Sequence, residues 1–313
     1  MKLINEQKEE IAAQADDLLT KNEEIQLQNS IIESKNRHIT DSINYAKKIQ
    51  KAVFQISEID KGIEQDFAIF LKPKDIVSGD FYWIKKVGSK SIFVGADCTG
   101  HGVPGAFMSL LGISYLNQVL QQSITRKREV VQKEHAKVGI YYEYIEAEDE
   151  LNSNPAAILE ELRNKIKNAL HQSDFETTAK DGIDLSLCIL DTNTNELQYA
   201  GAHRPLVYFS NEKLITIKAD RMPVGVHLKE KSFTIHKVRL QKGDCFYMFS
   251  DGIIDQFGED SGEKFKMKRL LDLIKKNTRL SPAGQVQLIE NEFDRWKGNH
   301  EQLDDVLFIV VKV

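Results

Sequence analysis

The sequence predicts an α/β protein in which antiparallel β-sheets are covered by helices on both outer faces, preceded by one long coiled-coil helix. Three observations support this prediction: an unbroken seven-residue apolar repeat near the N-terminus, short strand-like runs joined by tight turns, and a few longer helical segments. The chain has 313 residues. That length allows one core of roughly 200 to 250 residues and an additional segment.

The N-terminal segment carries the heptad repeat of a coiled coil. Its apolar row consists of Ile4, Ile11, Leu18, Ile25, Ile32, Ile39, Ala46 and Val53. We assign this row to the d positions, which places Lys8, Ala15, Asn22, Asn29, Asn36, Ile43 and Gln50 at the a positions. Buried asparagines at a favour a two-stranded coil at a cost in stability, so the pattern predicts a weak homodimeric zipper. The same repeat is compatible with a solvated single helix, a simple dimerisation stalk, or a coil whose register changes.

The first domain boundary follows the repeat, where Lys61 and Gly62 interrupt the pattern. We therefore expect a coiled-coil or regulatory linker helix over residues 1–58 and a second domain over 59–313. Residues 123–153 are the least regular part of that domain. We interpret them as a variable surface insertion, either a flap or a partner site.

Short apolar runs separated by turns such as DTNTNE and SNEK predict antiparallel strands rather than repeated βαβ units. We expect strands over residues 66–72, 79–87, 91–97, 183–190, 196–200, 205–209, 213–217, 232–238, 244–249 and 306–311. The expected helices cover residues 104–122, 154–171, 265–275 and 283–296. Pro104 and Gly102 fit the usual signals for a helix start.

Composition excludes several classes of protein. The net charge of −5 and the pI near 6.0 give no basic footprint for nucleic acid. No segment resembles a signal peptide, and no apolar stretch approaches the roughly 20 residues that cross a bilayer, so we expect a cytoplasmic protein without a membrane span. Cys98, Cys188 and Cys245 show no CxxC spacing, which argues against a disulfide framework and a thiolate zinc site.

Four aspartates, Asp80, Asp97, Asp251 and Asp304, lie next to glycines or other acids, and three of them begin or end a short apolar run. A carboxylate at a strand end is delivered to the rim of a sheet, where hard divalent cations can be held. Ligands that are all oxygen favour Mg²⁺ or Mn²⁺ over zinc. Two such ions bridged by an aspartate would lower the pKa of a shared water and direct it at phosphorus. The serines lack the GxSxG setting of a nucleophile.

From about Asp66 to Val313 the chain resembles the metal-dependent serine/threonine phosphatases of type 2C, also called the PPM family, in their bacterial SpoIIE-like branch. The motifs that carry the resemblance are SGDFYW (78–83), ADCTGHGVPGAFMS (96–109), DGIDLSLCILD (181–191), YAGAHRPL (199–206), FSDGIIDQFG (249–258) and DDVLF (304–308). The resemblance implies two stacked antiparallel sheets flanked by helices, with a centre of two Mn²⁺ or Mg²⁺ ions at one edge. It also implies that the helix at residues 39–53 precedes the domain as in related signalling proteins.

The family pattern assigns the aspartates unequal roles. Asp97 is expected to bridge both ions, and Asp80 to hold the first ion directly or through water. Cys98 is expected to offer only its backbone carbonyl. Asp251 and Asp304 are expected to hold the second ion, with Asp305 as an alternative ligand.

Other polar residues in these motifs have weaker assignments. His101 is displaced relative to the Gly-His-Gly of eukaryotic relatives, so it is either a general acid or a structural histidine. We interpret Gly100 to Gly105 as backbone that allows close approach beside the metals. Arg204 is expected to tie loops rather than touch substrate. Asp184, Asp255 and Gln302 are expected to support the ligands or anchor loops.

The resemblance implies a phosphoprotein phosphatase that hydrolyses phosphoserine or phosphothreonine by a metal-activated water, without a phosphoenzyme. It also implies a phosphorylated protein substrate of the kind found in bacterial partner-switching pathways, where anti-sigma factor antagonists are dephosphorylated. We expect regulation through the coiled coil, because the heptads run directly into the domain. Two alternatives remain: a non-catalytic dimeric interaction module with a decayed metal site, and a two-metal nucleotidyl cyclase, which the strand-rich order disfavours.

Overall fold

A computed structural model describes residues 2–54, 63–125, 128–135, 139–146, 149–172, 181–259 and 262–313. The chain divides into two compact units, Met1–Ile49 and Gln50–Val313. The boundary that we expected between residues 58 and 59 falls outside the described residues.

The first unit is formed by helix α1 (Lys2–Phe54), whose last turn belongs to the second unit. Neither proline nor glycine interrupts it. Five members of the predicted d row are more than half exposed, namely Ile11, Leu18, Ile25, Ile32 and Ile39. A long helix gains most of its stability from packing of an apolar face, and these five side chains are left exposed.

The second unit contains two antiparallel sheets. The five-stranded sheet has the order β1 (Asp66–Lys72), β15 (Val306–Lys312), β14 (Cys245–Phe249), β10 (Leu206–Ser210) and β11 (Lys213–Ile217). The other sheet has the order β13 (His236–Arg239), β9 (Glu196–Ala202), β8 (Gly182–Asp191), β3 (Lys90–Cys98) and β2 (Phe81–Val87), with β12 (Val224–Gly225) paired to β8. Consecutive strands are joined mainly by hairpins, as the turn residues predicted.

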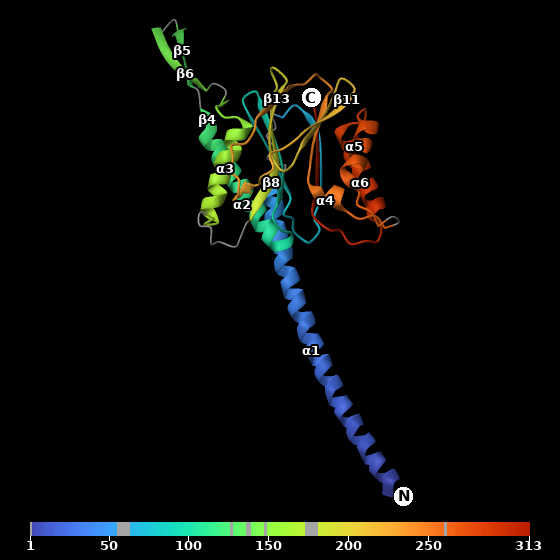
Figure 1. Cartoon of the computed structure of the whole chain (residues 1–313). Coiled ribbons are helices and arrows are strands. Elements are labelled where there is room, and N and C mark those ends of the chain that lie inside the picture. The colour runs from blue at the N-terminus through green and yellow to red at the C-terminus, as the bar shows by residue number, and fades with distance from the viewer. Residues whose placement is uncertain are drawn as a thin grey trace. The chain divides into compact units, whose positions relative to one another are not determined.

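The sheets stack face to face, and helices cover both outer faces (Figure 1). Helices α2 (Gly102–Ser123) and α3 (Pro155–Ala169) pack on the six-stranded sheet, whereas α5 (Lys266–Asn277) and α6 (Pro282–Lys297) pack on the five-stranded one. Between the sheets lies a core that includes Phe93 and Phe246, whose ring centroids are 5.6 Å apart in an edge-on contact. The predicted fold class is confirmed.

Helix starts are fixed by caps that satisfy the first free N–H groups. The side chain of Asn154 accepts from the backbone N–H of Ala157, and that of Ser281 accepts from Gly284. A proline occupies the first turn of both helices, a position that costs no hydrogen bond.

Helix α2 is a longer apolar segment than the sequence analysis led us to expect. Among the described residues it alone has the length and composition of a membrane span. Half of its most apolar 18-residue stretch is buried in the protein. Leu116 and Val119 belong to the core beneath the six-stranded sheet. A helix buried in a core meets the same criterion of composition as a membrane span.

The strand expected over 232–238 and the insertion differ from the sequence prediction. The strand expected over 232–238 begins only at His236, because the backbone N–H groups of Phe233 and Thr234 donate to the carboxylates of Glu160 and Asp220. The insertion is more regular than expected: β4 (Ile124–Thr125) pairs with β7 (Glu150–Leu151), and β5 (Arg128–His135) pairs with β6 (Gly139–Glu146). Residues 126–127, 136–138 and 147–148 of that insertion lie outside the described residues.

Candidate metal centre

A small cavity at one edge of the sandwich collects carboxylates from distant parts of the chain. Its volume is about 200 Å³. The lining residues are Asp97, Cys98, Thr99, Gly100, Asp184, Arg204, Asp251 and Asp304. Three of the four aspartates singled out in the sequence therefore line one cavity, together with Asp184.

The strand register explains the convergence. Asp97 on β3 lies directly opposite Asp184 on β8, so two carboxylates share one edge of the six-stranded sheet. Asp251 follows β14 and starts the short helix α4 (Asp251–Asp255), which the sequence did not predict because five residues show no clear periodicity. Asp304 precedes β15, the neighbour of β14.

Close backbone contacts hold the Asp251 and Asp304 segments together. The Ser250 N–H donates to the carbonyl of Leu307 over 3.0 Å, and the Leu307 N–H donates to the Ser250 hydroxyl over 2.9 Å. A Cβ at Gly252 would lie 1.9 Å from the carbonyl oxygen of Asp305. Only glycine allows this approach, so the Asp-Gly pair is required by packing and not only by a turn.

Asp80 does not line the cavity and is 1% exposed. Burial raises the pKa of its carboxyl well above the usual value, and the charge of Asp97 raises it further. Its Oδ2 atom is buried without a hydrogen-bond partner in the described structure. A buried carboxylate oxygen in this condition needs a proton or a cation.

The carboxylate of Asp305 contacts backbone groups of the loop between β1 and β2. Its oxygens accept from the N–H of Lys74 over 2.7 Å and from the N–H of Gly79 over 2.6 Å. This loop leads into Asp80, so Asp305 positions the segment that carries another candidate ligand.

Glycines permit the tight packing around this loop. A Cβ at Gly105 would lie 2.3 Å from the carbonyl oxygen of Gly100 and 2.9 Å from the Cα of Gly79. Gly100, Gly105 and Gly79 thus lie in close backbone contact, whereas the expected approach beside metals stays a prediction.

Arg204 was expected to tie loops, and the structure instead places its guanidinium against the carboxylates of the cavity. Its Nη2 atom lies 2.7 Å from Asp97 Oδ2, 2.8 Å from Asp251 Oδ2 and 3.4 Å from Asp184 Oδ2. The guanidinium therefore lies among the carboxylates and offsets part of their mutual repulsion. No spacing rule in the sequence indicates this contact, because Arg204 comes from the turn between β9 and β10.

The backbone carbonyl of Arg204 is held by two hydroxyl groups. Its carbonyl oxygen accepts from the hydroxyl of Tyr199 over 2.6 Å and from that of Ser186 over 2.9 Å. The guanidinium is thus supported by a fixed backbone, which favours one position of the side chain.

Cys98 and His101 differ in their relation to the cavity. Burial raises the pKa of the Cys98 thiol well above its usual value, so the thiolate that a nucleophile needs is disfavoured. His101 does not line the cavity: its Nδ1 lies 2.7 Å from Asp75 Oδ2, and its Nε2 lies 2.9 Å from Lys74 Nζ. Gln302 anchors the loop before β15 by donating to the carbonyls of Lys72 and Asp304 over 2.8 Å each.

The donor set fits a hard divalent cation. The side chains and carbonyls that line the cavity offer oxygen, and the cluster has more carboxylates than Arg204 can neutralise. Burial raises the pKa of Asp97 to about 8, opposed by Arg204 and reinforced by Asp251 and Asp304. Within the described residues, however, no three Asp, Glu, His or Cys side chains already form a group that could hold a metal. Arg204 contacts oxygens of Asp97 and Asp251, so a cation bound to these oxygens would compete with the guanidinium.

A family model described as stage II sporulation protein E (SpoIIE) matches residues 88–313. The chain resembles the SiaA-PP2C domain of Pseudomonas aeruginosa at 25% identity and a TM-score of 0.72, covering 89% of this chain and 98% of that one. No curated protein matches the chain.

Two further solved structures share the fold. The PP2C phosphatase domain of SpoIIE from Bacillus subtilis, solved with a fragment of its regulatory domain, is 20% identical with a TM-score of 0.55, covering 80% of this chain and 64% of that one. The RsbU and RsbW domains of Rv1364c from Mycobacterium tuberculosis are 16% identical with a TM-score of 0.57, covering 79% and 59%.

Replacing Arg204 by glutamine should destabilise the protein in EDTA, because the carboxylates lose their neighbouring cation. We expect a loss of about 3 kcal/mol in the free energy of unfolding, the usual effect of breaking a buried ion pair. The same variant should bind Mn²⁺ more tightly, since the ion no longer competes with the guanidinium. Urea unfolding in EDTA and isothermal titration calorimetry with Mn²⁺ measure the two effects.

The matched control is Arg221→Gln, which removes an exposed arginine from another turn. It should leave both quantities unchanged. Wild-type stability and Mn²⁺ affinity in Arg204→Gln would show that Arg204 does not act as the counter-charge.

Proposed function

The chain belongs to the SpoIIE family, and we propose that it is a metal-dependent phosphoprotein phosphatase that hydrolyses phosphoserine or phosphothreonine. The observation that carries the proposal is the convergence of Asp97, Asp251 and Asp304 on one small cavity at the edge of a PP2C-type sandwich. These residues come from three separate segments of the chain. Hard divalent cations are the natural counter-ions of such a cluster.

The proposed ligands are those that the family resemblance implies, and the cavity lined by Asp97, Asp251 and Asp304 supports the choice of these three. Asp97 would bridge two Mn²⁺ or Mg²⁺ ions. Asp80 would hold the first ion, directly or through water, together with the backbone carbonyl of Cys98. Asp251 and Asp304 would hold the second ion. Asp305 is the weaker candidate, because both of its oxygens already accept backbone N–H groups. When bound, two such ions lower the pKa of a water and offset charge on a phosphoryl group.

Direct attack by water, without a phosphoenzyme, is supported by the side chains of the cavity. The Thr99 hydroxyl donates to the carbonyl of Gly182 over 3.1 Å and accepts from its N–H over 3.0 Å. Burial disfavours the thiolate of Cys98. Among the described residues no base contacts either side chain, so neither is activated as a nucleophile. Arg204, the cationic side chain among the lining residues, is placed to hold phosphate oxygens.

The proposed substrate is a phosphorylated protein, such as an anti-sigma factor antagonist in a bacterial partner-switching pathway, and the proposed compartment is the cytoplasm. Membership of the SpoIIE family supports this substrate class. The cyclase alternative has no support in the fold, since the similar structures are PP2C phosphatase domains.

The interaction module without catalysis remains as the second candidate. The contacts of Arg204 with Asp97 and Asp251 favour it, because a guanidinium can permanently replace a cation in a decayed site. Metal-dependent phosphate release separates the two candidates.

Asp97→Asn and Asp251→Asn should each lower Mn²⁺-dependent phosphate release from phosphorylated casein by about a hundredfold or more, because each removes a charged ligand. EDTA should abolish the activity of the wild type. Asp191→Asn is the matched control, since Asp191 is the last residue of β8 and its carboxylate accepts backbone N–H groups of the following turn. Activity that survives both substitutions and EDTA would refute the metal mechanism, and an inactive wild type would favour the interaction module.

The last turn of α1 contacts the loop that carries Asp80. Gln50, predicted at an a position of the coil, is 5% exposed. Its amide donates to the carbonyl of Ser78 over 2.6 Å and accepts from the N–H of Ser78 over 3.1 Å. The amide also donates to the hydroxyl of Ser109 on α2 over 3.1 Å. One side chain thus joins α1, α2 and the residue two positions before Asp80.

These contacts support regulation of the metal site through α1. In the proposed mechanism, two copies of α1 pair through the exposed d row to form a homodimeric coiled coil. A change in that coil moves Gln50 and with it the backbone of Ser78. The position of Asp80 then changes, and with it the affinity of the site for metal.

Gln50→Ala should weaken Mn²⁺ binding by about fivefold or more and lower turnover, because the Ser78 backbone groups lose buried partners whose loss costs about 1 to 3 kcal/mol. Titration calorimetry and phosphate release measure the two effects. Lys51→Ala, at the exposed neighbouring position, is the matched control. Unchanged metal affinity and turnover in Gln50→Ala would contradict this route of control.

A further inference from the structure

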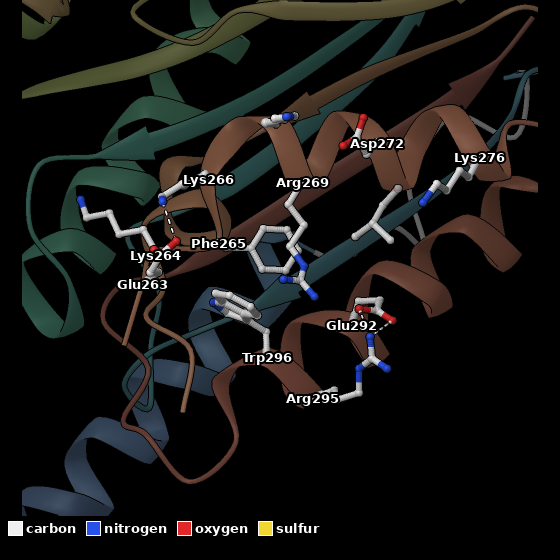
Figure 2. Close-up of a pocket in the computed structure, with 12 residues that line it drawn as sticks. Glu263, Lys264, Phe265, Lys266, Arg269, Asp272, Lys276, Glu292, Arg295 and Trp296 are labelled. Atoms are coloured by element: carbon white, nitrogen blue, oxygen red, sulfur yellow. Dashed lines mark hydrogen bonds and ion pairs between the residues drawn. The ribbon is translucent and has the colours of Figure 1, made fainter. Parts of the chain in front are cut away.

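A second, larger cleft lies between α5 and α6 (Figure 2). Its volume is about 530 Å³. Its lining residues are Glu263, Lys264, Phe265, Lys266, Lys268, Arg269, Asp272, Leu273, Lys276, Glu292, Arg295 and Trp296. None of these residues belongs to the candidate metal centre, so the cleft requires its own explanation.

The cleft is basic although the chain carries a net charge of −5. Six lining residues are cationic and three are acidic. Three of the cations pair with carboxylates: Lys264 with Asp255, Lys266 with Glu263, and Arg295 with Glu292. Among the described residues, Lys268, Arg269 and Lys276 have no carboxylate partner. They come from one helix, α5, and give the cleft its uncompensated positive charge.

Arg269 is held in place by aromatic rings. Its guanidinium carbon lies 4.1 Å from the centroid of the Trp296 ring and 5.3 Å from that of Phe265 (Figure 2). The two rings contact each other edge-on at 5.8 Å. A guanidinium stacked in this way keeps its N–H edge available for a carboxylate, and little freedom is lost when that bond forms.

The aromatic floor of the cleft is hydrogen-bonded to the segments that carry two of the candidate metal ligands. The indole N–H of Trp296 donates to the carbonyl of Gln256 over 3.1 Å, and Gln256 directly follows α4, which starts at Asp251. The side chain of Gln256 is fully buried and accepts from the N–H of Leu303, next to Asp304, over 3.0 Å. The cleft and the metal centre therefore share one rigid support.

We propose that this cleft docks an acidic segment of the phosphoprotein substrate, so the inference rests on the phosphatase function proposed above. Separated carboxylates of a polypeptide fit the unpaired cations of α5, and the shared support holds the docked segment in a fixed relation to the cavity. A nucleic-acid backbone fits less well, because Glu263, Asp272 and Glu292 interrupt the cationic lining. Anionic lipid headgroups attract clusters of Lys and Arg, which these same acidic residues interrupt here.

The test compares a double variant, Lys268→Glu with Lys276→Glu, and the single variant Arg269→Gln with the wild type. Lys275→Glu is the matched control, because Lys275 is exposed on the same helix and does not line the cleft. The probes are a fluorescein-labelled glutamate-rich peptide, phosphorylated casein and p-nitrophenyl phosphate. Fluorescence anisotropy measures peptide binding, and phosphate or nitrophenol release gives KM and kcat.

We expect the double variant to lose peptide binding and to raise the KM for casein by about tenfold or more, because each reversed charge repels the acidic segment. Arg269→Gln should weaken peptide binding and raise the KM for casein to a smaller extent. The kcat/KM for p-nitrophenyl phosphate should stay within about twofold of the wild type, since that substrate has no segment to dock. Lys275→Glu should match the wild type with all three probes.

Wild-type peptide binding by the double variant would overturn the proposal, as would an equal loss of activity towards both substrates. Double-stranded DNA or phosphatidylserine vesicles that bind more tightly than the peptide, with the same dependence on Lys268 and Lys276, would also overturn it. A wild type that cannot hydrolyse p-nitrophenyl phosphate would contradict the phosphatase proposal, whereas the anisotropy measurement would still decide whether the cleft binds acidic peptide.

Discussion

Electrostatic repulsion among carboxylates is the constraint on which the rest of this structure depends. One small cavity at the edge of the sandwich is lined by Asp97, Asp184, Asp251 and Asp304. Asp80 is buried nearby, and its pKa is raised by burial and by the charge of Asp97. Charges gathered in this way destabilise a fold unless a cation offsets them. Arg204 supplies that cation within the chain, on a backbone anchored by Tyr199 and Ser186. The same carboxylates form the oxygen ligand set that hard divalent ions prefer, so the proposed metals and Arg204 compete for one set of partners.

Three other parts of the molecule are connected to this cluster by short chains of contacts. Gln50 joins the end of α1 to Ser78, two residues before Asp80. Asp305 fixes the same loop from the opposite side through Lys74 and Gly79. Gln256 joins the segments of Asp251 and Asp304 to the aromatic floor of the α5–α6 cleft. A change at α1 would thus act on the position of Asp80. A substrate bound in the cleft would act on the positions of Asp251 and Asp304, which belong to the same site.

Much of the fold and part of the site could be predicted from sequence because the signals are local. Strand β1 matches its predicted bounds since its apolar run ends in polar residues on both sides. Asp97, Asp251 and Asp304 were found because each stands at the end of such a run. Arg204, Gln50 and the α5–α6 cleft could not be found in this way. Their contacts join residues that are far apart in the chain, for example Arg204 and Asp97, which are 107 residues apart. Such contacts form only when the sheets stack. The strand expected from residue 232 failed for a similar reason, because the carboxylates of Glu160 and Asp220 take the backbone donors.

The central claim is that the carboxylate cluster holds two divalent ions bridged by Asp97. Anomalous diffraction from crystals of the full chain grown with Mn²⁺ tests it most directly, because the signal locates manganese independently of activity. The account predicts two manganese peaks beside Asp97, one on the side of Asp80 and the other contacting Asp251 and Asp304, with the guanidinium of Arg204 turned away from at least one of its present partners. Manganese absent from the cavity at saturating concentration, with Arg204 still bonded to Asp97 and Asp251, would contradict it.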